Sequence, residues 1–200
     1  MELVSCSKAA VPGMLPSGIF VNTQLDYLLS SLPDRLVQNG PSRLTVEVEP
    51  DGPCAEGQPV LRIVQWSDNW LFIEPAGPRE LTTLVVESLV GKDPVNELLS
   101  CHYKPDEGEY GYALFREGIL LETFETSGPT LENVNFTSEL RKVSLQELLK
   151  AADFMVESIS QFGIEPASLP PMEVWETLIH VHFPAKRTFW QALLGAASSK

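Results

Sequence analysis

Basic residues are scarce in this chain of 200 residues. Lysine and arginine together number 14, against 27 aspartates and glutamates, which gives a formal net charge of −13 at pH 7. A nucleic-acid-binding surface needs a basic face that replaces the counterions of the phosphates, and the only basic pairs are Arg141-Lys142 and Lys186-Arg187. We therefore expect no direct binding to nucleic acid. The acidity suits a basic protein partner, although high net charge also serves solubility alone.

Long apolar runs and cysteines are also few. No run of about eighteen apolar residues is present, so we expect no membrane-spanning helix and no membrane contact. The N-terminal stretch contains Glu2 and a single Lys8 and lacks a charged segment leading into an apolar block, which is not typical of a signal peptide. Cys6, Cys54 and Cys101 are an odd number without CxxC spacing, which favours reduced thiols. These features predict a cytoplasmic protein.

Catalytic motifs are missing as well. The sequence has no G-x-S-x-G, no phosphate-binding glycine loop and no H-E-x-x-H. Cys101 and His102 are adjacent, and on a strand they would point to opposite faces, so they cannot form a nucleophile–base pair. His180 and His182 would share a face on a strand and could then bind a metal, but no acidic or cysteine cluster with zinc spacing accompanies them. We assign no catalytic, metal-binding or cofactor-binding residue and expect no cofactor.

The order of predicted elements indicates an α+β fold with a mostly antiparallel sheet. Residues 1–21 are rich in proline, glycine and small side chains and are expected to form an irregular arm. Residues 22–165 are expected to form a single domain, with helices on one or both faces of the sheet. Residues 166–200 should contain a proline-rich connection and a C-terminal helical segment, in which residues 172–183 could be partly a strand.

Alternating and periodic patterns predict the individual elements. We expect strands at 44–49, at 60–66 and at 70–74, the last two joined by a turn at Ser67-Asp68-Asn69. Residues 95–103 favour a strand, with a helix beginning at Asp93 as the alternative. Three segments have helical spacing: about 25–32, where Pro33 should end or kink the helix; about 79–90; and about 144–162, which begins with a Ser144/Glu147 capping box.

A hairpin is expected at about 109–125, "EYGYALFREGILLETFE", in the centre of the sheet. Glu117 is a poor residue for positive φ, so we expect a type I turn with Gly118 in the left-handed region. This register would pair Phe115 with Ile119, Tyr112 with Glu122, and Tyr110 with Phe124. One face would then be fully apolar and suited to helix packing.

The other face of the hairpin carries two tyrosines, a phenylalanine and a carboxylate, and it has two interpretations. A second layer of structure could cover it as part of the core. Alternatively it could be a partner surface, because aromatic side chains are enriched in interface hot spots. The apolar stripe of the C-terminal segment is a further candidate docking element. The candidate partner-binding residues are Tyr110, Tyr112, Glu122, Phe124, Phe189 and Trp190.

The segment from Trp66 to Glu125, with a strand, a helix and then the hairpin "YGYALFREGILLETF", resembles small bacterial cytoplasmic proteins that include toxin-neutralising immunity proteins. This resemblance implies an acidic α+β binding protein. The first functional hypothesis is therefore a non-catalytic protein-binding module, such as an inhibitor, immunity protein or adaptor subunit. The second is an enzyme with an unrecognised site near His180 and His182. The third is a structural subunit of a larger assembly that docks through its C-terminal helix.

Overall fold

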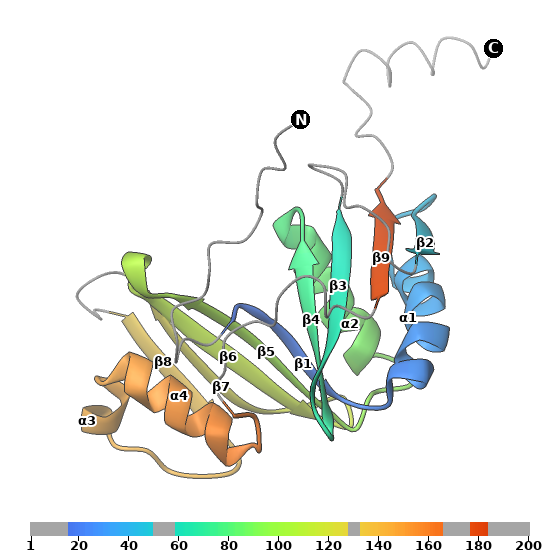
Figure 1. Ribbon diagram of the computed structural model, residues 1–200. Helices are drawn as coiled ribbons and strands as arrows, with labels where there is room; N and C mark the ends of the chain where they lie inside the picture. Colours follow the sequence, from blue (N-terminus) through green and yellow to red (C-terminus); the bar gives the residue numbers. More distant parts are fainter. Residues whose placement is uncertain (1–15, 50–58, 128–132, 166–176, 184–200) are drawn as a thin grey trace, which may run out of the picture.

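A single antiparallel sheet organises the protein. The computed structural model describes residues 16–49, 59–127, 133–165 and 177–183. Within these ranges, nine strands pair in the order β2-β9-β3-β4-β1-β5-β6-β7-β8 (Figure 1), which confirms the expected α+β class with an antiparallel sheet. None of the helices in these ranges has the length and apolar character needed to cross a membrane. The strands are β1 (Gly18–Asn22), β2 (Thr45–Glu49), β3 (Val60–Ser67), β4 (Trp70–Ala76), β5 (Glu97–Lys104), β6 (Glu109–Arg116), β7 (Ile119–Ser127), β8 (Asn133–Ser138) and β9 (Thr177–His182).

The helices cover different halves of the sheet. Helices α1 (Leu25–Asn39) and α2 (Arg79–Val90) lie beside β2, β9, β3 and β4, whereas α3 (Leu145–Leu148) and α4 (Ala151–Gln161) lie over β6, β7 and β8 (Figure 1). A short 3-10 turn, η1 (Pro105–Glu107), joins β5 to β6. Each set of helices closes its own hydrophobic core, and both faces of the sheet are therefore used.

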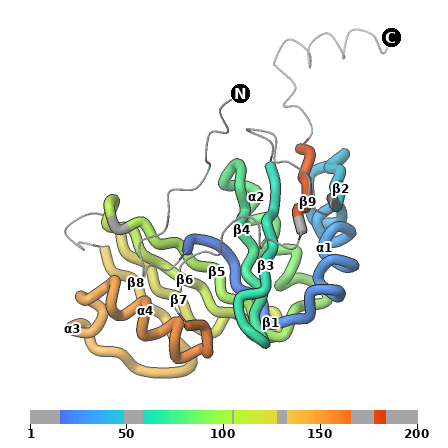
Figure 2. The backbone as a smooth tube through the Cα atoms, in the orientation of Figure 1, coloured from blue at the N-terminus to red at the C-terminus, as the bar shows by residue number. Residues whose placement is uncertain are grey.

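The two cores meet at the central strand β1, which runs across the middle of the sheet (Figure 2). Ile19 and Val21 belong to the cluster that packs on α1 and α2, which we call the first core. Phe20 points to the opposite face and belongs to the cluster under α3 and α4, the second core. Residues 18–21 were expected to belong to an irregular arm, and this expectation was wrong. A strand buried on both faces shows a continuous apolar run instead of alternation, so the usual strand pattern is missing.

Several predicted elements are confirmed. Helix α2 spans 79–90 as expected, and five side chains of its predicted stripe are buried. Residues 97–104 form a strand, so the helical alternative is wrong. Strands β3 and β4 form a hairpin around Asp68 and Asn69. The five buried side chains of α2 mentioned above are Leu81, Leu84, Val85, Ser88 and Leu89.

Pro33 lies inside helix α1. Of the two predicted outcomes, an end of the helix at Pro33 is wrong, because the helix continues to Asn39. A proline inside a helix loses one backbone hydrogen bond, yet the continuation buries Leu36 on the same face as Leu28 and Leu32. Burial of that third leucine in the first core offsets the lost bond.

The helix expected at 144–162 is divided. The capping box is confirmed, because the Ser144 hydroxyl accepts from the Glu147 backbone N–H and the Glu147 carboxylate accepts from the Ser144 N–H. Backbone angles leave the helical region at Lys150, where φ is −91° and ψ is 45°. Leu145 and Leu149, which belong to the predicted stripe, are exposed, while α4 buries its own apolar face. One straight stripe therefore does not run through both segments.

The β6–β7 hairpin is present, but its turn and register differ from the prediction. Glu117 and Gly118 have φ of 49° and 78°, so the connection is a two-residue turn with both residues in the left-handed region. Such turns match the right-handed twist of the flanking strands, and the Glu117 N–H donates to the Asn96 carbonyl at 2.9 Å. A bulge between Leu114 and Phe115 then shifts the pairing. The hairpin lies between β5 and β8, toward one end of the nine strands.

The C-terminal part contains a strand where helices were the first expectation. Residues 177–182 form β9, which pairs with both β2 and β3. The alternation in "TLIHVH" is a strand pattern, and burial of Ile179 and Val181 in the first core fixes its register. The rest of the expected segment 166–200, apart from Phe183, lies outside the described residues.

Candidate functional site

The aromatic and acidic face of the hairpin is interior. Tyr112, Glu122 and Phe124 have exposed fractions of 3%, 1% and 1%. Tyr112 pairs with Phe124 across the strands, and Phe154 of α4 packs edge-on against Phe124 with ring centroids 4.9 Å apart. The interpretation of these three side chains as an exposed partner surface is therefore wrong, because α4 covers them.

Tyr110 and the C-terminal candidates have other outcomes. Tyr110 pairs with Thr126 and is half-buried, and its ring meets Tyr103 edge-on at a centroid distance of 5.3 Å. Its register differs from the prediction, which had paired it with Phe124. Phe189 and Trp190 lie outside the described residues.

Glu122 is the centre of a buried hydrogen-bond network. Its Oε1 accepts from the Tyr112 hydroxyl at 2.6 Å and from Arg141 Nη2 at 2.7 Å. Its Oε2 accepts from the Ser138 hydroxyl at 2.6 Å and from Arg141 Nε at 3.1 Å. Both carboxylate oxygens are therefore satisfied, as a buried charge requires.

Arg141 connects this carboxylate to α4. Its Nη2 donates to the Ser158 hydroxyl at 2.7 Å and its Nη1 to the Gln161 side chain at 2.8 Å. The guanidinium also lies over the Phe154 ring at 5.2 Å. One side chain thus holds the segment after β8 and helix α4 against the sheet.

The directions in which the pKa values of Glu122 and Tyr112 are shifted are consistent with a structural role for both side chains. Burial alone would raise the pKa of Glu122, but hydrogen bonds from Arg141, Ser138 and Tyr112 outweigh it and lower the pKa below its usual value. Burial and the bond to Glu122 raise the pKa of Tyr112. A carboxylate that stays ionised with all its acceptor positions in use is not available as a general acid or base.

The opposite face of the hairpin is only partly covered. It was expected to be a helix-packing face, but Ile119 at the hairpin tip has an exposed fraction of 65%. No helix in the described ranges covers this side chain, because α2 packs mainly on α1 and on the strands of the first core. The expectation that a helix packs on this whole face is therefore wrong at the hairpin tip.

Cys101 and His102 lie on opposite faces of β5, as predicted. The Cys101 thiol is buried in the second core and donates to the Pro16 carbonyl at 3.2 Å. Burial raises the pKa of this thiol to about 12, so it is a poor nucleophile at neutral pH. Burial lowers the pKa of His102, and the nearby Glu125 and Glu109 partly oppose this shift.

His180 and His182 lie on β9 and so share a face, which was the condition set for metal binding. His180 is buried and pairs with Glu47 of β2, while His182 Nε2 lies 3.8 Å from the Glu47 carboxylate. Across the described residues, no group of three or more histidine, cysteine or acidic side chains is arranged to hold a metal ion. This geometry gives the two histidines no third ligand from the described part of the chain.

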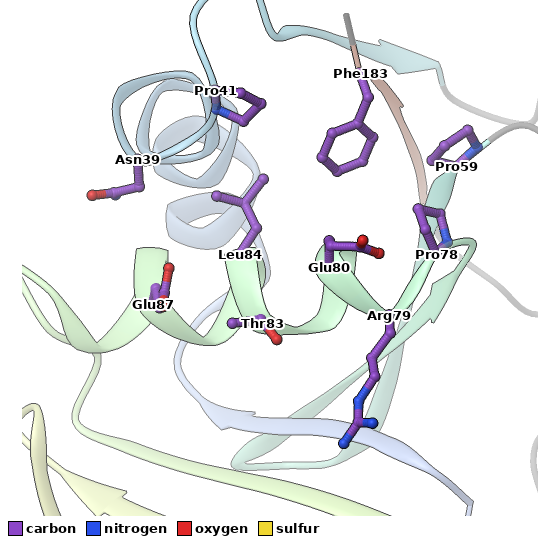
Figure 3. Close-up of a pocket in the computed structure, with 10 residues that line it drawn as sticks. All are labelled: Asn39, Pro41, Pro59, Pro78, Arg79, Glu80, Thr83, Leu84, Glu87 and Phe183. Atoms are coloured by element: carbon purple, nitrogen blue, oxygen red, sulfur yellow. The ribbon is translucent and has the colours of Figure 1, made fainter. Parts of the chain in front are cut away.

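A groove beside α2 is a prominent concave feature of the described residues, and sequence reasoning missed it. It encloses about 910 Å³, within the range of ligand-binding clefts. Figure 3 shows the Phe183 ring and the Leu84 side chain pointing into the same space, beyond the C-terminal end of α1. We call it the α2 groove. Its lining residues are Asn39, Pro41, Pro59, Pro78, Arg79, Glu80, Thr83, Leu84, Glu87 and Phe183.

The α2 groove combines an apolar floor with a charged rim that holds two carboxylates, Glu80 and Glu87, and one guanidinium, that of Arg79. Three prolines, Leu84 and Phe183 supply the apolar surface, and Glu80, Thr83 and Glu87 are exposed along one side of α2. Residues seven apart on a helix lie on the same face, about 10 Å apart along its axis. Among the described residues, no basic side chain forms an ion pair with Glu80 or Glu87. Both carboxylates are therefore available to a positively charged ligand.

The sequence carried only a weak signal for the α2 groove. Its residues come from four separate segments that lie next to turns or helix ends, so no local sequence pattern brings them together. Comparison with known proteins adds no relative: no family model, no curated protein and no solved structure matches this chain.

Proposed function

We propose that this protein is a non-catalytic protein-binding module, such as an inhibitor, immunity protein or adaptor subunit, and that it binds its partner in the α2 groove. The partner contributes an apolar segment flanked by basic side chains. The observation that carries this proposal is the groove itself, an apolar cleft of about 910 Å³ with Glu80 and Glu87 along one side.

The shape and charge of the groove favour a peptide segment as the ligand. Glu80, Thr83 and Glu87 form a straight row, which suits a ligand with charges spaced along its length. The apolar floor provides burial, and the acidic row orients the segment and speeds the encounter of a basic partner with a protein of net charge −13. Nucleic acid is not the proposed ligand, because acidic side chains repel phosphates. The proposed location is the cytoplasm.

Affinity capture with three forms of the full chain tests the proposal. The wild type, an E80K/E87K variant and an E139K/E157K control would each be used as bait in extracts of the source cells. Glu139 and Glu157 are exposed and distant from the α2 groove, and the control changes the net charge by the same amount. We expect one stoichiometric protein that the wild type and the control retain and the E80K/E87K variant loses.

Two results would overturn the proposal. One is an identical set of proteins on all three baits, and the other is a wild-type eluate that contains the chain alone. Thermal unfolding of each bait checks that the substitutions leave the fold intact.

A further inference from the structure

The chain enters the α2 groove at Phe183. This residue directly follows β9, is half-buried and packs against the first core, and its ring points into the groove (Figure 3). Whatever follows Phe183 in the sequence therefore starts at the groove wall. This continuity identifies one candidate occupant within the chain.

The segment after Phe183 has the chemistry that the groove would recognise. Residues 186–194 read "KRTFWQALL" and contain an apolar stripe at Phe189, Trp190, Leu193 and Leu194, directly preceded by Lys186 and Arg187. The other basic pair in the chain is Arg141-Lys142, and Arg141 is already committed to Glu122. Lys186-Arg187 is thus the basic pair that remains to complement Glu80 and Glu87.

The connection is long enough for this contact. Phe189 lies six positions after Phe183, and an extended chain over six steps spans about 20 Å. The row from Glu80 to Glu87 covers about 10 Å of helix axis. A tethered segment also has an effective concentration in the millimolar range, so even weak contacts keep it bound.

We infer that residues 186–194 of the same chain occupy the α2 groove in the absence of a partner, with Phe189 and Trp190 over Leu84 and with Lys186 and Arg187 beside Glu80 and Glu87. This inference rests on the proposed function, because it makes the segment a competitor of the partner peptide. Partner binding then requires displacement of the segment. The apparent association constant of the partner is reduced to the intrinsic constant multiplied by the fraction of molecules whose groove is empty.

Photo-crosslinking in the full chain tests the occupancy. A benzophenone amino acid would replace Trp190 in one form and Ser198 in a control form, and crosslinked peptides would be located by mass spectrometry. We expect the probe at 190 to crosslink within one molecule to residues 78–87, and the probe at 198 to give little product there. Crosslinks in a dimer band, crosslinks to other parts of the sheet, or no crosslink at position 190 would each overturn the inference.

A charge exchange tests the ionic part of the contact. E80K/E87K should reduce the crosslink yield at position 190, E139K/E157K should leave it unchanged, and addition of K186E/R187E to E80K/E87K should restore it. A yield in the fourfold variant no higher than in E80K/E87K would overturn the pairing of these charges.

Partner capture separates this inference from the proposed function. If both are correct, F189A/W190A should retain more partner than the wild type. Capture that depends on Glu80 and Glu87 but is unchanged by F189A/W190A would refute the inference and leave the proposed function standing. Crosslinking to the groove without any captured partner would refute the proposed function instead.

Discussion

Arg141 is the side chain on which the attachment of α4 to the sheet depends most. Its removal by Arg141→Ala leaves the fully buried Glu122 carboxylate without its cation. Breaking a buried ion pair on one side typically costs about 3–5 kcal/mol, because an uncompensated charge remains. We expect a loss of that size in the free energy of unfolding, measured by urea denaturation.

The matched control is Arg116→Ala. Arg116 forms an equally short pair with Glu97, but its side chain is largely exposed, and such pairs contribute about 0–1 kcal/mol. Equal losses for the two variants would contradict a special role for the buried network.

The same network predicts a pH dependence. The pKa of Glu122 is lowered in the folded protein, while the pKa of a glutamate in an unfolded chain is about 4.3. The stabilisation from this carboxylate is therefore complete above about pH 4.3 and is lost as the pH falls through the lower folded pKa. We expect Glu122→Gln to be less stable than the wild type at pH 7 and to lose less further stability between pH 5 and pH 3. Parallel curves for the two proteins, from urea denaturation at each pH, would contradict this.

Tyr112, Glu122 and Phe124 show what sequence reasoning could and could not give at the level of residues. Their alternation correctly placed them on one face of the hairpin. The choice between core and partner surface depended on the layer above them, which is α4, and on Arg141, which lies 19 residues beyond Glu122 and had been noticed only as part of a basic pair. Contacts between distant segments leave no local pattern, so the buried network could not be inferred.

The β6–β7 turn provides a prediction at the level of elements. Glu117 adopts a φ of 49°, and left-handed backbone costs a side chain with a Cβ about 1–2 kcal/mol. Asparagine tolerates this region and, with glycine after it, is the preferred pair for such turns. Glu117→Asn should therefore raise the free energy of unfolding by about 0.5–1 kcal/mol.

Gly118→Ala is the opposing variant for the same turn. Gly118 has a φ of 78°, and a Cβ there would lie 2.7 Å from the Val90 carbonyl oxygen. We expect it to destabilise the protein by at least about 1–2 kcal/mol. Thermal unfolding of both variants tests the turn type, and a loss of stability in Glu117→Asn would contradict it.

The predictions were correct for elements with one solvent-exposed face and wrong for elements buried on both faces. Helix α2 has an exposed side, so the spacing of its apolar residues was visible and its boundaries were correct. Strand β1 has none, and its residues 18–21 read as part of a proline-rich and glycine-rich arm. The α2 groove was equally hidden, because Pro41, Pro59 and Phe183 come together only through the pairing of β9 with both β2 and β3.

At the scale of the whole molecule, β1 joins the two cores. Phe20 packs against Trp66 and Phe72 in the second core, with ring centroids 5.1 and 4.8 Å away, while its neighbours Ile19 and Val21 fill the first core. A strand that shares its side chains between both cores couples their stability. We therefore expect the described sheet to unfold in one cooperative transition, although its helices form two separate groups.

Thiol labelling of Cys101 tests this coupling. In a C6S/C54S variant, Cys101 is the single remaining cysteine, and its burial in the second core protects it while that core is closed. The urea midpoint for its labelling should coincide with the midpoint of the far-ultraviolet circular dichroism, which reports the helices of both cores. Phe20→Ala removes a fully buried aromatic ring, costs about 3–5 kcal/mol, and should lower both midpoints by the same amount. Labelling of Cys101 at a urea concentration where the circular dichroism is still native would instead mean that the second core opens alone and that β1 does not couple the two halves.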